Sequence, residues 1–191
     1  VILPEMFSTG FTMDSLRHAE TMNDQTVGWM LEKANAIDAA ICGSLIISQN
    51  TKVYNRLIWA SPRGELFFYD KRHLFRMANE HRFFSPGTDR LIVEHCGWRI
   101  APSICYDLRF PVWLRNRDDY DLAIFVANWP SKRQIAWSTL LRARAIENIS
   151  YSCGVNVTGV DGAGVEYAGG SSIFDPLGEP VAEHFEDRIV A

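Results

Sequence analysis

The pattern of apolar and polar positions in the first half of the chain predicts one helix among short strands. Apolar residues at 27, 30, 31, 34 and 37 recur at the 3.6-residue spacing of an amphipathic helix. Stretches rich in β-branched and aromatic residues predict strands at 41–48, 53–60 and 65–71, with a turn at 61–64 between the last two. An opening strand at 1–3 is expected to precede them.

The second half has the same mixed pattern. Residues 72–90 are charged and irregular, which predicts a long loop, and such loops in compact domains are often functional. A short helix is expected at 111–116 and a long one at 131–149. The predicted strands are at 91–94, 98–104, 121–127, 151–157, 171–175, 180–185 and 188–191.

Strands with intervening helices indicate an α/β domain in which a sheet is layered with helices. No internal repeat, low-complexity stretch or linker divides the chain, so residues 1–191 are expected to form a single domain. The chain opens and closes on strand-like residues without an initiating Met. We therefore expect it to be trimmed at both ends.

Composition excludes some function classes. The 19 basic and 23 acidic residues give a net charge of −4, which argues against a nucleic-acid partner. The apolar run at 122–127 is far too short to cross a membrane. The four cysteines (Cys42, Cys96, Cys105 and Cys153) are dispersed and suggest neither a zinc site nor a disulfide framework. Free thiols and a cytoplasmic location are expected.

Four residues are candidates for chemistry. Cys105 ends the strand at 98–104, Lys71 ends the strand at 65–71, and Glu5 lies just past the opening strand. Glu80 lies in the charged loop. Because sites in open α/β sheets collect beyond the carboxyl ends of strands, these side chains are expected to converge.

This set suits an amide hydrolase with a thiol nucleophile. A free thiol is only a few per cent thiolate at neutral pH, and a neighbouring carboxylate can take its proton. Attack on an amide carbonyl creates an oxyanion, which a lysine ammonium and a backbone N–H can stabilise.

Each candidate also has a plainer interpretation. A lone Cys is usually a small core residue, and Lys71 alone is typical of a surface charge. Glu5 can cap a loop, and Glu80 can be one more solvated charge. His18, His73, His81, His95 and His184 leave a Cys–His dyad open, although none stands in a motif that favours it.

Three segments resemble the Glu, Lys and Cys motifs of the nitrilase superfamily, in the same order. They are Leu3-Pro4-Glu5-Met6-Phe7, Tyr69-Asp70-Lys71-Arg72-His73-Leu74-Phe75 and Ile104-Cys105-Tyr106-Asp107-Leu108-Arg109-Phe110-Pro111. The likeness continues through 128–130 and 142–148 and runs along the whole chain. Within the superfamily, Phe7-Ser8-Thr9-Gly10-Phe11 and residues 105–113 are most similar to the bacterial omega-amidase branch.

The resemblance implies roles for these residues. Glu5 is implied as the general base, Lys71 as the oxyanion-stabilising cation and Cys105 as the nucleophile, with Glu80 as the second glutamate of the site. The Tyr106 N–H is implied as the second oxyanion donor. We expect no metal and no cofactor.

The implied substrate is a small linear amide such as 2-oxoglutaramate or 2-oxosuccinamate. Its distal carboxylate needs a cation, for which Arg109 is a candidate, although a structural ion pair of Arg109 with Asp107 or another acid is the alternative. Trp129 and Phe11 are candidates for lining the pocket, or else core residues.

The implied fold is a four-layer α-β-β-α sandwich, here lacking the first strand and helix and the C-terminal extension. The family commonly forms homodimers or higher homo-oligomers. Two alternative functions stay open: another hydrolase of the superfamily, such as a carbamoyl-amide hydrolase or aliphatic amidase, and a catalytically silent binding protein on the same fold.

Overall fold

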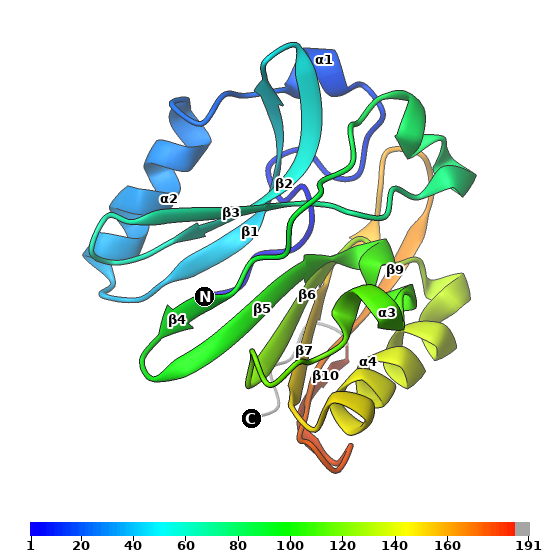
Figure 1. Cartoon of the computed structure of the whole chain (residues 1–191). Helices are drawn as coiled ribbons and strands as arrows, with labels where there is room; N and C mark the ends of the chain where they lie inside the picture. The colour runs from blue at the N-terminus through cyan, green and yellow to red at the C-terminus, as the bar shows by residue number, and fades with distance from the viewer. Residues whose placement is uncertain (186–191) are drawn as a thin grey trace. The chain divides into compact units, whose positions relative to one another are not determined.

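The computed structural model describes residues 1–185, which form two compact units, Val1–Leu91 and the chain from Ile92 onward (Figure 1). Each unit combines helices with a β-sheet, as the α/β prediction requires.

The first unit is built on a three-stranded antiparallel sheet in the order β1-β2-β3. Asn50 and Thr51 join β1 to β2 with φ of 49° and 66°, as a two-residue hairpin turn demands. The elements of this unit are α1 (Ser15–His18), α2 (Gln25–Ala36), β1 (Ile41–Gln49), β2 (Lys52–Ala60), β3 (Leu66–Asp70) and the 3₁₀ turns η1 (Arg76–Ala78) and η2 (Glu80–Arg82).

Helix α2 covers one face of this sheet. Its buried residues Val27, Met30 and Ala34 pack with apolar residues of β1 and β2 such as Leu45 and Ile58. Because side chains alternate across a strand, Ser44 and Asn55 point to the opposite face of the sheet. That face carries the polar cluster described below.

The second unit holds a seven-stranded mixed sheet in the order β10-β9-β7-β6-β5-β4, with β8 paired to β9. Strands β5, β6 and β7 are parallel, and the other pairs are antiparallel. The elements are β4 (Val93–His95), β5 (Trp98–Ile104), η3 (Cys105–Arg109), α3 (Pro111–Leu114), β6 (Leu122–Ala127), η4 (Ser131–Arg133), α4 (Gln134–Asn148), β7 (Tyr151–Asn156), β8 (Thr158–Val160), β9 (Glu166–Phe174) and β10 (Pro180–Phe185).

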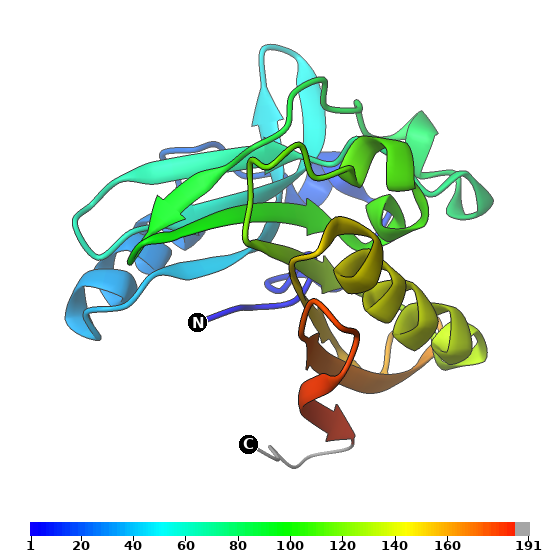
Figure 2. The same ribbon diagram turned by 60° about the horizontal axis from the view of Figure 1, so that its bottom comes forward.

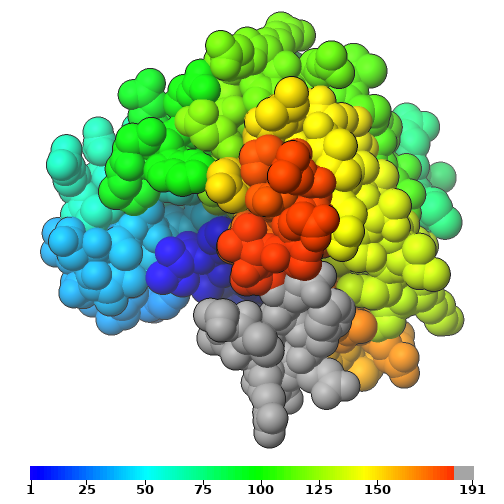
Figure 3. Space-filling model, turned by 90° about the horizontal axis from the view of Figure 1, so that it is seen from below, coloured from blue at the N-terminus to red at the C-terminus, as the bar shows by residue number. Residues whose placement is uncertain are grey.

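Helix α4 links β6 to β7 and packs tightly on the sheet of its own unit (Figure 2). A Cβ at Gly154 of β7 would lie 2.4 Å from Leu141 and 2.6 Å from Trp137, so this close packing requires glycine. The turn before β10 lies on the surface (Figure 3), and both Leu177 of this turn and Val181 of β10 are exposed.

Several predicted boundaries need correction. The opening residues form only an isolated bridge, between Ile2 and Cys42, because they are too short a partner for a ladder. The predicted loop at 72–90 contains the turns η1 and η2, and the helix expected at 131–149 starts with the 3₁₀ turn η4. Strand β9 is longer than predicted, while α1 and β8 had no clear sequence signal. The strand expected at 188–191 lies outside the described residues.

Gly87 provides a test of the packing that fixes the end of β3. A Cβ there would lie 2.2 Å from the Asp70 carbonyl oxygen, and the Gly87 N–H donates to the Lys71 carbonyl at 3.0 Å. We expect G87A to lower the free energy of unfolding by about 1–3 kcal/mol, measured in urea. In the control G28A, nothing lies within 4 Å of the new Cβ, so the higher helix propensity of alanine should raise the free energy of unfolding slightly. Equal stability of G87A and wild type would contradict the argument.

Candidate active site

Glu5 lies in a tight loop that is bonded to β1. Ser44 accepts the Phe7 N–H through its carbonyl at 3.2 Å and accepts the Met6 N–H through its hydroxyl at 2.9 Å. Met6 has a φ of 45°, in the left-handed region, and its carbonyl accepts the Gly10 N–H. The loop therefore holds the Glu5 side chain in the interior, where only 1% of it is exposed.

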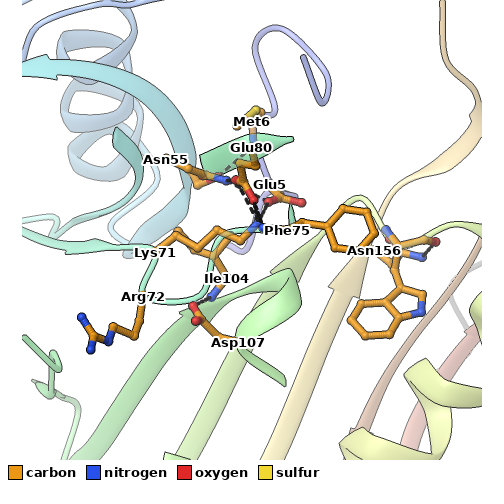
Figure 4. A network of polar contacts seen from close by, with 12 residues as sticks. Glu5, Met6, Asn55, Lys71, Arg72, Phe75, Glu80, Ile104, Asp107 and Asn156 are labelled. Carbon is orange, nitrogen blue, oxygen red and sulfur yellow. Dashed lines mark hydrogen bonds and ion pairs between the residues drawn. The ribbon is translucent and has the colours of Figure 1, made fainter. Parts of the chain in front are cut away.

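Lys71 directly follows β3, and its side chain is completely buried. Its Nζ donates to Glu5 Oε1 at 2.8 Å and to both carboxylate oxygens of Glu80, at 3.1 and 3.0 Å (Figure 4). A buried ammonium is costly unless it is paired, and two carboxylates supply that pairing here. Lys71 is therefore not a surface charge, and the Glu5 carboxylate is part of a buried ion pair.

Glu80 begins η2, directly after Asn79, which adopts a left-handed φ of 59°. Its carboxylate also accepts the Phe75 N–H and an N–H of Asn55, and the residue has no exposed surface. Burial raises the pKa of Glu80 above its ordinary value, the nearby Lys71 ammonium opposes that rise, and the Glu5 carboxylate adds to it. The interpretation of Glu80 as a solvated charge is wrong.

Asn55 is a member of this cluster that the sequence analysis missed. Its Nδ2 donates to Glu5 Oε1 at 2.8 Å and to Glu80 Oε1 at 3.2 Å (Figure 4). The polar Asn55 stands just before the apolar run 57–60 of strand β2, and this was a signal for it, because buried amides need hydrogen-bond partners.

Cys105 lies in the second unit, at the point where β5 ends and η3 begins. It is buried and has a φ of 45°, a left-handed conformation that is uncommon outside glycine. The Asp107 carboxylate accepts the Ile104 N–H at 3.2 Å, which closes the turn around Cys105. Strained backbone of this kind clusters at functional sites.

Arg144 of α4 supports the same turn. Its Nε and Nη2 both donate to the Leu108 carbonyl, at 3.0 and 2.8 Å, and its Nη1 pairs with Glu147 at 2.6 Å. Arg144 is 4% exposed. The turn that carries Cys105 is thus bonded to a long helix of its own unit.

The other cysteines differ in their surroundings. Cys42 and Cys153 are buried and Cys96 is exposed, and none of these three is in a disulfide. Burial raises the pKa of the Cys153 thiol to about 12, so it remains protonated and unreactive at neutral pH.

The structure places the remaining candidate residues in two regions. The Arg109 guanidinium lies 4.9 Å from the centroid of a Trp129 ring. Trp129 is buried, and the Tyr106 ring packs edge-on against Phe110. In the first unit, Phe11 is half-buried, and its ring centroid lies 5.6 Å from Lys71 Nζ.

Residues 1–185 contain neither a candidate metal site nor a helix that could span a membrane. No group of three or more His, Cys, Asp or Glu side chains in this range is arranged to hold a metal ion. No helix in the described part of the chain is long and apolar enough to cross a membrane.

The sequence pattern of the carbon-nitrogen hydrolase family matches residues 1–189. The chain belongs to the carbon-nitrogen hydrolase family. It is 50% identical to omega-amidase YafV of Escherichia coli K12 over 182 residues, covering 95% of this chain and 71% of that protein. It is 34% identical to 2-oxoglutaramate amidase of Bacillus subtilis, covering 96% of this chain and 72% of that protein.

Solved structures of the family share the fold. A CN-hydrolase superfamily protein from Xanthomonas campestris, with an arsenic adduct in its active site, is 51% identical and gives a TM-score of 0.97 over all of this chain and 75% of its own. Saccharomyces cerevisiae Nit3, a nitrilase-superfamily member, is 26% identical and gives 0.87 over 97% of this chain and 72% of its own. The predicted nitrilase-type α/β fold is confirmed, and the chain is a carbon-nitrogen hydrolase.

Proposed function

We propose that this hydrolase is an omega-amidase that converts a small linear amide to a carboxylic acid and ammonia through a thioester on Cys105. The observation that carries the proposal is the fully buried Lys71 ammonium held between Glu5 and Glu80. Such a cluster places a base and a cation at one point, as cysteine-dependent amide hydrolysis requires.

The substrate class follows from the relatives. The matched Escherichia coli protein is named an omega-amidase and the Bacillus subtilis protein a 2-oxoglutaramate amidase. We propose 2-oxoglutaramate or 2-oxosuccinamate as the substrate, each with a carboxylate far from the amide.

In the first half-reaction, the Glu5 carboxylate accepts the Cys105 thiol proton as the sulfur attacks the amide carbon. The Lys71 ammonium and the Tyr106 N–H stabilise the oxyanion of the tetrahedral intermediate. Protonated Glu5 then donates its proton to the amide nitrogen, the C–N bond breaks, and ammonia leaves a thioester on Cys105.

In the second half-reaction, water attacks the thioester carbon while Glu5 accepts a proton from it, and Glu80 helps to position the water. The second oxyanion collapses, the C–S bond breaks, and the proton returns to the Cys105 sulfur. The products are the carboxylic acid and the free thiol, so the cycle needs no external redox partner.

A substrate panel tests the proposed function. We expect kcat/KM to be highest for 2-oxoglutaramate or 2-oxosuccinamate when ammonia release is compared across these two, an N-carbamoyl amine and a short aliphatic amide. A preference for the N-carbamoyl amine or the short aliphatic amide would assign the chain to another branch of the superfamily. Absence of turnover with every substrate would support a silent binding protein.

Arg109 is the proposed partner of the distal carboxylate of the substrate. We expect R109M to raise KM for 2-oxoglutaramate about 10- to 100-fold, because a charged hydrogen bond contributes roughly 1.5–3 kcal/mol. KM for an uncharged aliphatic amide should stay near the wild-type value. Equal effects on both substrates would indicate that Arg109 only packs against Trp129.

We also propose three properties of the whole protein. Residues 1–191 act as one catalytic domain, which is supported by the match of a single family pattern to residues 1–189. The chain works as a homodimer or a higher homo-oligomer, and it works in the cytoplasm, where the Cys105 thiol stays reduced.

A further inference from the structure

We propose that Asn55, oriented by Ser44, is a positioning residue that holds the carboxylates of Glu5 and Glu80 in place around the Lys71 ammonium. This inference deepens the proposed function and rests on it, because it assigns a task to a residue outside the Glu–Lys–Cys set. Asn55 lies beside Glu5, Glu80 and Lys71 (Figure 4).

The backbone N–H of Met6 fixes the direction of the hydrogen bonds in this network. The Met6 N–H can only donate, and it donates to Ser44 Oγ at 2.9 Å. The Ser44 hydroxyl proton is then available for another acceptor and is donated to Asn55 Oδ1 at 2.8 Å. With its oxygen engaged there, the Asn55 amide presents its NH₂ group to the carboxylates.

Both N–H bonds of that group have an acceptor. Asn55 Nδ2 lies 2.8 Å from Glu5 Oε1 and 3.2 Å from Glu80 Oε1. A flipped amide would instead point its oxygen at two carboxylates, which is repulsive. Ser44 therefore selects the one amide orientation that the two glutamates accept.

The charge of the cluster explains why such a donor matters. Two carboxylates share one ammonium, and Glu5, Glu80 and Lys71 are all at most 1% exposed, so water does not screen the excess negative charge. Neutral N–H donors stabilise ionised carboxylates without adding a charge. The amide thus favours the ionised form of Glu5, which must accept the thiol proton.

Ser44 also holds the backbone around Glu5 in place. Besides its hydroxyl bond to Met6, its carbonyl accepts the Phe7 N–H and its N–H donates to the Pro4 carbonyl at 3.4 Å. The residues on both sides of Glu5 are therefore bonded to a single residue of β1. Ser44 of β1 therefore holds the backbone on both sides of Glu5, and Asn55 of β2 holds its carboxylate.

Three variants test the proposal kinetically. N55L removes both donors and should lower kcat about 10- to 100-fold while KM changes little, because charged hydrogen bonds are lost. The acid limb of its kcat/KM profile should move to higher pH, since Glu5 and Glu80 are harder to ionise. S44A should give a smaller loss in the same direction.

N55D gives the most specific result. The introduced carboxyl repels both glutamates when ionised but can donate an O–H when protonated. Its activity relative to wild type should therefore rise as the pH falls from 8 to 5.5. A side chain that only filled space would give a constant ratio, and that result, or wild-type kinetics in N55L, would overturn the proposal.

Unfolding provides a readout that does not need activity, so it separates this proposal from the proposed function. In N55L the folded-state pKa of Glu80, which burial already raises, should rise further, because its carboxylate loses an N–H donor. A carboxyl group whose pKa is higher in the folded state than in the unfolded state stabilises the fold at a pH below its unfolded-state pKa, near 4.3. This stability is lost as the pH rises through the folded-state pKa.

The stability deficit of N55L in urea should therefore grow between pH 5 and pH 8. The matched control is N148L, since Asn148 is a buried asparagine whose bonds go to Asn116 and the Arg144 carbonyl rather than to a carboxylate. Its deficit should be the same at both pH values. A pH-independent stability deficit in N55L would overturn the proposal, whether or not the wild type shows amidase activity. Absence of amidase activity in the wild type would count against the proposed function alone.

Discussion

C105A is expected to lose ammonia release from 2-oxoglutaramate almost completely, with kcat falling on the order of 10⁶-fold, as when a covalent nucleophile is removed. Neither Glu5 nor Lys71 can replace the sulfur, because no thioester forms without it. C105S should be nearly as inactive, since a serine hydroxyl needs a stronger base than a carboxylate. Steady-state assays with a sensitive ammonia readout measure both variants.

Cys96 supplies the matched control for this experiment. It is an exposed free cysteine of the same unit, so C96S should leave turnover unchanged. Mass spectrometry after brief exposure to substrate should find the acyl adduct on Cys105. An adduct on Cys96, or activity retained by C105A with an unchanged unfolding temperature, would refute the assignment of the nucleophile.

K71M should lower kcat about 100- to 1,000-fold, because the oxyanion loses a charged donor that contributes roughly 2.7–4 kcal/mol. It should also destabilise the fold by about 3–5 kcal/mol, because two buried carboxylates lose the ammonium between them. Kinetics and urea unfolding measure the two effects separately.

The stability loss of K71M should depend on pH in a defined direction. Burial already raises the pKa of Glu80, and removal of the neighbouring cation raises it further. The stability that comes from a raised carboxyl pKa is present below the unfolded-state pKa, near 4.3, and is lost as the pH rises through the folded-state pKa. The stability deficit of K71M should therefore be larger at pH 8 than at pH 5.

A double variant separates the two roles of Lys71. K71M/E80Q removes one of the two carboxylates, so it should regain much of the lost stability without regaining turnover. If K71M turned over substrate at the wild-type rate, the oxyanion role would be wrong. If the double variant were as unstable as K71M, charge imbalance would not be the cause of the instability.

Local pattern was sufficient to predict the regular elements. The 3.6-residue repeat of Val27, Met30 and Ala34 predicted α2, because a helix on a sheet must bury one stripe. The strands β2 and β5 were predicted almost to the residue, since β-branched and aromatic runs bounded by turns have few alternatives. Strand β9 was predicted too short, because its glycines at 169 and 170 weaken the local signal.

The sequence alone therefore determined the α/β class and the position of Cys105 at the end of β5. Only the tertiary structure decided which charges are buried together. Lys71 meets Glu5 across 66 positions in the sequence, and Glu80, read as a possible surface charge, has no exposed surface. Only the tertiary structure shows that Asn55 donates hydrogen bonds to Glu5 and Glu80. The physical reason is that burial and ion pairing depend on contacts between distant segments, which periodicity along the chain does not encode.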